Sequence, residues 1–238
     1  MTIDSILQRY RTGERDFHGI ELREAELINA NLPHVDFSEA DLRQSRLGRT
    51  NFTQARFCRA DLSEAILWGA DLTEADLRLA ILRDADLSGA KLIHAHLEGA
   101  NLIKACLCGA NLSGVQLTAA SLIEADLRPT LDQRTDLGRA NLAEADLSYA
   151  HLSQALLKQA NLEGAKLCRS ILRSEPWRDA FVTDLSEASL RGADLSYADL
   201  SGVILRNANL KDADLTGTVL TGADLMGATL PNGMITLP

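Results

Sequence analysis

The sequence repeats with a period of five residues, and this period restricts the possible folds more than any other feature. From Phe17 to Leu172, every fifth residue is Leu or Phe, and of these 32 positions only Asp132 departs. Ala fills 23 of the 32 places two residues earlier, and Asp or Asn usually stands between the two. The repeating unit is therefore A(D/N)LXX, as in ADLSEA at 60–65 and ANLIKA at 100–105.

A period of five excludes an amphipathic α-helix, because successive Leu residues would advance about 140° around its axis and reach every face. In an extended chain, residues two apart share one face, so Ala and Leu point inward together while Asp or Asn points outward. Aromatic residues make up only 4% of the chain, as expected if Leu and Ala fill the interior. The pattern therefore predicts a narrow all-β solenoid.

The A(D/N)LXX signature resembles that of the pentapeptide-repeat family over almost the whole chain. The resemblance implies a right-handed quadrilateral β-helix with four repeats in each coil. Residues 20 apart should then stack in columns along the rod. The competing hexapeptide and leucine-rich repeats have the wrong period.

The ends of such a stack expose apolar side chains and unpaired backbone groups, so they need caps. Thr2 can begin a short helix and Gly13 can end it. Four apolar residues between them share one helix face, at Ile3, Ile6, Leu7 and Tyr10. This predicts an N-terminal α-helical cap. The C-terminal PNGMITLP is predicted to be either a small cap or an end-to-end contact between two copies.

Two interruptions divide the repeats. We expect a helical cap over 1–14, coils over 15–174 with an in-phase interruption at 128–136, a register break at 175–182, and C-terminal coils over 183–238. The first interruption contains a Pro that should break the ladder, and it is predicted to be a bulge or a protruding loop. The second shifts the register by three residues.

The interruptions are the candidate partner-binding sites. Trp and Phe beside Arg is the composition of an interface hot spot, although these rings could instead fold back over the register break. The candidate residues are Arg128, Asp132, Arg134, Trp177, Arg178 and Phe181, together with Trp68, a bulky residue at an outward position. The alternative for Trp68 is a ring lying along the neighbouring coil.

A 20-residue stacking period also predicts an acidic face. Its carboxylates would either form charge pairs between coils or dock a basic partner. The predicted face contains Glu24, Asp41, Asp61, Glu64, Asp84, Glu124 and Glu144.

Charge and composition argue against several functions. The formal charge of −9 argues against direct binding of nucleic acid, and no apolar run approaches the length of a membrane span. We expect a cytoplasmic protein whose four cysteines are free thiols, because no pair looks well placed for a disulfide. No metal, cofactor or catalytic residues are predicted, since no convergent polar site or metal-ligand set appears.

Several non-repeat strings also resemble a cyanobacterial member of the family that regulates heterocyst differentiation. They include ILQRYRTGERDF at 6–17, ADLSEAILWGADL at 60–72, NLIKACLCGANL at 101–112 and DLRPTLDQRTDLG at 126–138. The resemblance implies a non-enzymatic regulator that binds another protein, with a transcription factor of the HetR type as the suggested partner. The alternative is an acidic DNA mimic that binds DNA gyrase or another topoisomerase, a role known for some members of the family.

Overall fold

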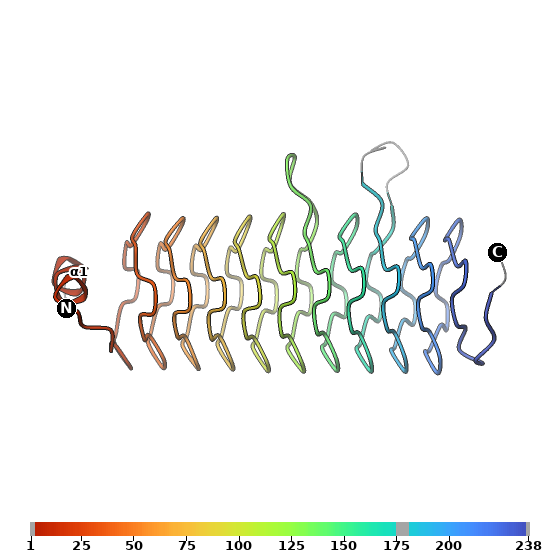
Figure 1. Cartoon of the computed structure of the whole chain (residues 1–238), viewed down its shortest axis with the longest axis horizontal. Helices are drawn as coiled ribbons and strands as arrows, with labels where there is room; N and C mark the ends of the chain where they lie inside the picture. The colour runs from red at the N-terminus through yellow and green to blue at the C-terminus, as the bar shows by residue number, and fades with distance from the viewer. Residues whose placement is uncertain (1–2, 175–180, 237–238) are drawn as a thin grey trace.

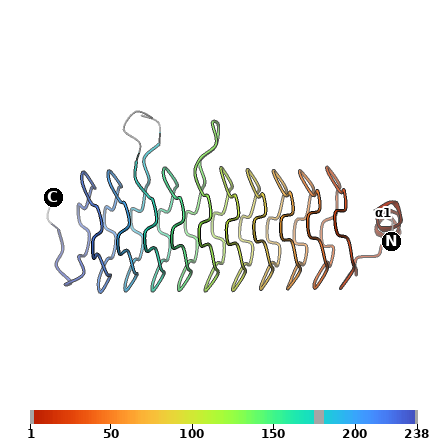
Figure 2. The same ribbon diagram turned by 180° about the vertical axis from the view of Figure 1, so that it is seen from behind.

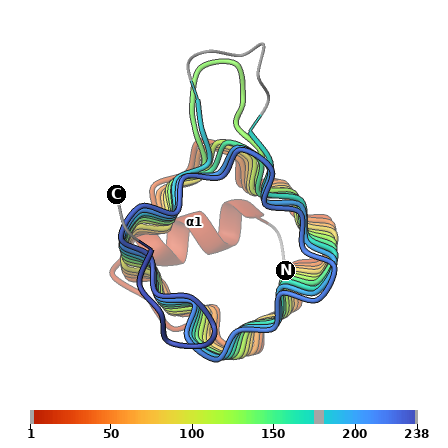
Figure 3. The ribbon, with the colours of Figure 1, turned by 90° about the vertical axis from the view of Figure 1, so that its right-hand side faces the viewer.

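The computed structural model describes residues 3–174 and 181–236. They form a straight rod whose backbone winds through stacked four-sided coils (Figures 1 and 3). The predicted right-handed quadrilateral β-helix is confirmed. A single helix, α1 (Ile3–Arg11), lies across the N-terminal end. The same rod seen from behind shows both termini at its opposite ends (Figure 2).

Parallel β-bridges connect each coil to the next, with one bridging residue per side. Within the described residues these bridges are single pairs and no longer strand is formed. We number the sides 1 to 4 by their bridge columns. These begin at Asp16–Asp36, Glu21–Asp41, Glu26–Arg46 and Asn31–Asn51, respectively.

Each repeat has the same internal layout, which the repeat at 61–65 illustrates. Asp61 takes the first outward position, Leu62 points inward, Ser63 takes the second outward position, Glu64 forms the corner and Ala65 points inward. The Asp61 Oδ1 accepts the Ser63 backbone N–H at 3.0 Å. An acidic or amide side chain is therefore favoured at the first outward position because it satisfies a turn N–H that would otherwise lack a partner.

The corner residue has a left-handed backbone, with φ of 58° at Glu64. Inward Leu and Ala are almost completely buried along the rod. Near the N-terminal end, four rings from Phe17, Phe37, Phe52 and Phe57 fill the interior, and the Phe52 and Phe57 centroids lie 5.1 Å apart. Along the described coils, the period of five thus produces a core packed with Leu, Ala and Phe side chains.

The two ends of the rod are closed differently. Ile6 of α1 is fully buried against the first coil, and Tyr10 Oη donates to the Pro33 carbonyl at 2.8 Å. Thr2, the predicted N-cap, lies outside the described residues. At the other end, the chain returns in one antiparallel bridge from Thr229 to Ile235. Ile235 remains 66% exposed there, so the C-terminal end is the less covered of the two.

Candidate partner-binding surface

Both interruptions leave the rod at the same corner, between sides 3 and 4 (Figures 1 and 3). The first loop, residues 128–135, joins the side 3 bridge at Asp126 to the side 4 bridge at Asp136. The second loop, residues 173–183, joins Ile171 to Asp184 in the same way. One regular coil separates the two loops, so they are about 10 Å apart at the usual layer spacing. The first loop and residues 181–183 of the second loop therefore lie close together on one corner, although they are distant in the sequence.

The first loop protrudes from the rod and is closed by its own hydrogen bonds. The Thr130 N–H donates to the Gln133 carbonyl at 2.8 Å, and the Gln133 N–H donates to Thr130 Oγ1 at 3.1 Å. Leu131, next to this turn, is 87% exposed. Asp132 holds a core position in the sequence register but is exposed in the structure, because the inserted repeat leaves the ladder altogether.

A glycine lets the first loop lie against the preceding coil. A Cβ on Gly109 would stand 2.8 Å from Thr130 Cγ2 and 3.3 Å from the Gln133 carbonyl oxygen. Both distances are shorter than an ordinary van der Waals contact. The loop's position therefore depends on the absence of a side chain at this corner.

A threonine follows each loop and replaces the inward Ala. Thr135 Oγ1 accepts the Gly109 N–H at 2.9 Å, and Thr183 Oγ1 accepts the Gln154 N–H at 2.7 Å. Both threonines are fully buried. Thr183 is the acceptor for the Gln154 N–H, whereas Thr135 is a second acceptor for the Gly109 N–H, which also donates to the Arg128 carbonyl at 3.0 Å.

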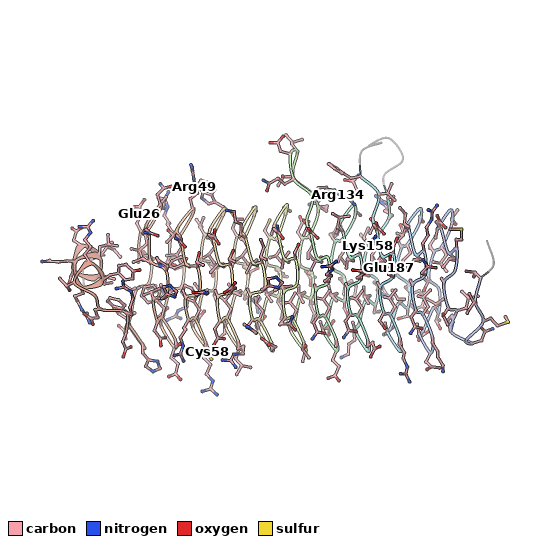
Figure 4. The ribbon with its side chains drawn as sticks, in the orientation of Figure 1. Glu26, Arg49, Cys58, Arg134, Lys158 and Glu187 are labelled. Carbon is pink, nitrogen blue, oxygen red and sulfur yellow. The ribbon has the colours of Figure 1, made fainter. Side chains whose placement is uncertain are left out.

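Arg134 connects the two loops (Figure 4). Its Nε donates to the Gln154 carbonyl at 2.9 Å, and its guanidinium also donates to the Val182 carbonyl in the second loop. The same guanidinium lies 5.1 Å from the ring centroid of Phe181. Burial lowers the pKa of Arg134, and the carboxylates of Asp184 and Asp136 oppose that shift. We call the two loops with this bridge the composite loop surface.

The remaining predicted loop residues have different settings. Arg128 is exposed and forms a two-pronged ion pair with Asp126, at 2.9 and 2.6 Å. Trp177 and Arg178 lie outside the described residues. The structure thus brings Arg134 and Phe181 into contact, whereas Arg128 pairs with Asp126 and not with the second loop.

Two residues at this corner carried no recognised sequence signal. Gln154 belongs to the coil between the loops and is only 2% exposed, and within the described residues its Nε2 has no hydrogen-bond partner. The coil that contains the first loop has one extra repeat, so that Asp136 stacks on Asn111. The position of Gln154 at this corner can be predicted only if that extra repeat is taken into account. Leu131 could have been noticed as an apolar residue out of register beside Asp132.

Trp68 lies on side 3, but three coils before the first loop. A Cβ on Gly48 would stand 2.6 Å from its indole Nε1, so the ring covers the glycine of the preceding coil. The Arg49 guanidinium lies 5.8 Å from the ring centroid. The ring therefore lies along its neighbour, as the alternative prediction held, and remains 41% exposed.

The predicted acidic face requires one correction. Glu24, Glu64, Asp84 and Glu124 share a column on side 2, but Glu144 lies on side 1. The Glu144 N–H donates to the Glu163 carbonyl, and the Ala143 carbonyl accepts the Ala119 N–H. Glu163 and Ala119 both belong to side 1. The prediction was wrong because the first loop adds one whole repeat to its coil, which moves every later residue by one side.

Basic residues partner the carboxylates of side 2. Arg43 binds Asp41 at 2.5 Å and approaches Asp61 at 3.7 Å. Its hydrogen bond lowers the pKa of Asp41. Farther along, Lys104 lies 3.7 Å from Glu124. These pairs between coils reduce the net charge of the face.

The geometry shows a rigid repeat scaffold with two loops on one corner, and the comparisons agree on the scaffold. The family model for pentapeptide repeats matches eight copies, over 16–49, 40–78, 80–115, 135–173, 183–207 and 193–232. The chain belongs to the pentapeptide-repeat family. The matched stretches leave out 116–134 and 174–182, which hold most of both loops.

One solved structure superposes closely on this rod. HetL, a pentapeptide-repeat protein involved in heterocyst differentiation regulation from the cyanobacterium Nostoc sp. strain PCC 7120, is 56% identical. The match covers 99% of this chain and 100% of HetL, with a TM-score of 0.98. The two rods therefore share their fold along the whole length.

Two other solved structures superpose weakly. A pentapeptide-repeat protein from the Arabidopsis thaliana thylakoid lumen is 30% identical over 48% of this chain and 73% of its own, with a TM-score of 0.32. The fluoroquinolone resistance protein QnrB1 is 19% identical over 88% of each chain, with a TM-score of 0.37. No curated protein sequence matches.

Within 3–174 and 181–236, no group of three or more His, Cys, Asp or Glu side chains is arranged to hold a metal ion. No helix described there has the length and apolar character needed to cross a membrane.

Proposed function

We propose that the protein is a cytoplasmic, non-enzymatic regulator that binds a HetR-like transcription factor or another regulatory protein through the composite loop surface. The single observation that carries the proposal is the Arg134 bridge, which joins two interruptions distant in sequence into one projection. The similarity to HetL supports a role in regulation. Leu131 supplies an exposed apolar anchor, and Arg128, Asp132, Trp177 and Arg178 belong to the proposed contact.

The test is the affinity of the purified protein for a HetR-family transcription factor of the same host. Leu131→Asp places a charge on the exposed turn of the first loop. It should weaken binding at least tenfold, because a charged side chain cannot fill an apolar pocket on the partner. Leu79→Asp is the matched control, since Leu79 is also exposed, at 49%, but lies on side 1. Equal binding by both variants and the wild type would exclude this surface.

Arg134→Ala tests whether the loops bind as a unit. It should weaken binding while leaving the coils folded, because Arg134 hydrogen-bonds to the backbone carbonyls of Gln154 and Val182 and not to the Leu core. Arg139→Ala is its control, as Arg139 pairs with Gln159 on side 4 outside both loops. Trp68→Ala extends the test to the far end of side 3.

The proposed assembly is a monomer or an end-to-end dimer. The exposed Met234 and Ile235 at the C-terminal end support the dimer, because an uncovered end exposes apolar surface. Sedimentation over a range of concentrations separates the two states. Ile235→Glu should abolish a dimer formed at this end and leave a monomer unchanged.

The second candidate is an acidic DNA mimic that binds gyrase. The side 2 column of Glu24, Glu64, Asp84 and Glu124 favours it, whereas Arg43 and Lys104 within that side weaken it. A gyrase supercoiling assay tests it directly. Absence of inhibition at saturating protein would exclude this function.

A further inference from the structure

Two cysteines occupy positions where other repeats place an acid and a hydroxyl. In several regular repeats, an Asp at the first outward position accepts two hydrogen bonds from a Ser at the second. Asp86 Oδ1 accepts the Ser88 backbone N–H at 2.9 Å and the Ser88 hydroxyl at 2.5 Å. Asp61 and Ser63 repeat this arrangement at 3.0 and 2.5 Å. The layout of the repeat thus lets these two side chains come into contact.

Cys106 and Cys108 take the same two positions one coil after Asp86 and Ser88. Both are half-buried free thiols. Cys108, two residues farther along the same repeat, lowers the pKa of Cys106 through its thiol and backbone N–H. The Ser88 hydroxyl lies 3.1 Å from the Cys106 sulfur. Cys106 therefore lies beside a hydroxyl and a second thiol.

The ionisation of the two thiols differs accordingly. The hydrogen bond from Cys108 lowers the pKa of Cys106 to about 6, against burial and the charge of Asp86. The same hydrogen bond raises the pKa of Cys108, as do its burial and the carboxylate of Asp126. The nearby cation is Arg128, held in its ion pair with Asp126. At neutral pH, the pair thus holds one thiolate and one thiol.

We propose that Cys106 and Cys108 form a redox-active dithiol that is oxidised by low-molecular-weight disulfides such as oxidised glutathione. The Cys106 thiolate attacks one glutathione sulfur and releases the other glutathione as a thiolate. Cys108 then transfers its proton to that thiolate and attacks the Cys106 sulfur, which releases the second glutathione. Starting from the thiolate–thiol pair, the protein loses two electrons and one proton. The second glutathione leaves as a thiolate and takes its proton from solvent, so one glutathione disulfide becomes two glutathione thiols.

The geometry favours a reversible bond. Two residues apart in one chain, the Cα atoms lie within the limit of about 7 Å for a disulfide. A bridge across a single inward residue is nevertheless strained, and strained disulfides are readily reduced. Cys108 also lies 3.8 Å from the Asp126 carbonyl at the base of the first loop. Oxidation would remove that contact.

The experiment incubates the reduced full-length protein in glutathione buffers of increasing oxidising strength and maps disulfides by mass spectrometry. Wild type should lose two hydrogens in the peptide that contains Cys106 and Cys108. Cys108→Ser should stop at a mixed disulfide between Cys106 and glutathione. The Cys106→Asp, Cys108→Ser double variant restores the Asp-x-Ser pair and should fold normally without forming either product.

Cys58 and Cys168 are the internal controls. Each stands alone at a second outward position, two residues after Arg56 or Lys166, and is half-buried like the pair. Wild type that gains glutathione equally on all four cysteines, with no Cys106–Cys108 bond, would overturn the proposal. The bond should form unchanged in a Cys58→Ser, Cys168→Ser variant.

A second measurement follows the alkylation rate of Cys106 against pH. Its midpoint should lie near pH 6 and move upward in Cys108→Ala, which removes the thiol next to Cys106. A wild-type midpoint at the ordinary thiol pKa of about 8.5 would contradict the paired arrangement.

Discussion

The regular corners and the interrupted corners of this rod solve the same problem in different ways. At a regular corner such as Gly89, one residue with φ of 63° turns the chain, and the next bridge joins Lys91 to Asn111. At the interrupted corners, the corresponding bridges join Asn111 to Asp136 and Leu156 to Asp184, across a longer stretch of chain. The coils on either side nevertheless keep their fully buried Leu and Ala.

The difference shows which part of the fold tolerates insertion. Extra residues leave at the corner, where the backbone already faces solvent, and a buried Thr accepts a corner N–H beside each insertion. The core therefore keeps its packing and the insertion adds surface. Four predictions test this contrast, beginning with the one expected to change stability most.

If the interrupted coil is packed as well as a regular one, Leu137→Ala and Leu142→Ala should be equally destabilising. Both side chains are completely buried, so each change should cost about 2–5 kcal/mol of unfolding free energy. Chemical denaturation followed by circular dichroism measures the loss. A much smaller loss for Leu137, the first inward Leu after the loop, would mean that the loop loosens the core.

The threonines that close the loops should matter more than a threonine in a regular coil. Thr183→Val leaves the Gln154 N–H, bonded at 2.7 Å, without its acceptor, which should cost about 1–3 kcal/mol. Thr50 only donates to the Leu27 carbonyl, which also accepts the Ala30 N–H. Thr50→Val should therefore cost about 0.5–1.5 kcal/mol. The same denaturation curves compare them, and equal losses would count against the closing role.

A methyl group at Gly109 should displace the first loop, whereas one at Gly89 should not. The two corners have φ of 66° and 63°, so the backbone penalty is shared. Gly109→Ala adds a clash with Thr130, while the nearest atom to a Cβ at Gly89 is Gln133 Oε1 at 3.9 Å. Gly109→Ala should be less stable than Gly89→Ala by about 1–3 kcal/mol.

Faster proteolysis at the first loop in Gly109→Ala, compared with Gly89→Ala, would locate the change. Identical cleavage and stability of the two variants would contradict the contact between Thr130 and this corner.

The smallest effect is expected from two matched ion pairs. On a regular coil, Arg78 donates two hydrogen bonds to the Asp76 carboxylate, from Nε at 2.8 Å and from Nη2 at 2.7 Å. Arg128 binds Asp126 at the base of the loop in the same way. The hydrogen bond from Arg78 lowers the pKa of Asp76. Burial raises the pKa of Asp126, but hydrogen bonds from Arg128 lower it by more. The pKa of Asp126 therefore lies below its ordinary value.

A lowered pKa in the folded state stabilises the protein above the unfolded-state pKa of about 4, and that stabilisation disappears as the pH falls through the folded-state value. Arg78→Ala and Arg128→Ala should therefore lower the melting temperature slightly at pH 7, and the deficit should shrink toward pH 3. A deficit that is constant over this range would assign the effect to packing.

Most of the scaffold could be predicted from the repeat. The inward residues, the outward Asp or Asn and the helical cap follow from side-chain alternation and from the need to bury apolar ends. The positions of surface residues were harder to predict, as Glu144 shows. Its place depends on whether the chain leaves the ladder for one whole repeat at 128–135, and a period of five is unchanged by an insertion of five.

The sequence alone therefore specifies which side chains point into the rod, because Leu at every fifth position leaves one way to bury them. The sequence alone does not specify on which side a residue after the first loop lies. It also does not specify that the two loops come into contact. These depend on stacking between coils, which sets Arg134 beside the Val182 carbonyl, far along the chain. Local periodicity encodes the interior, whereas contacts between distant coils create the surface.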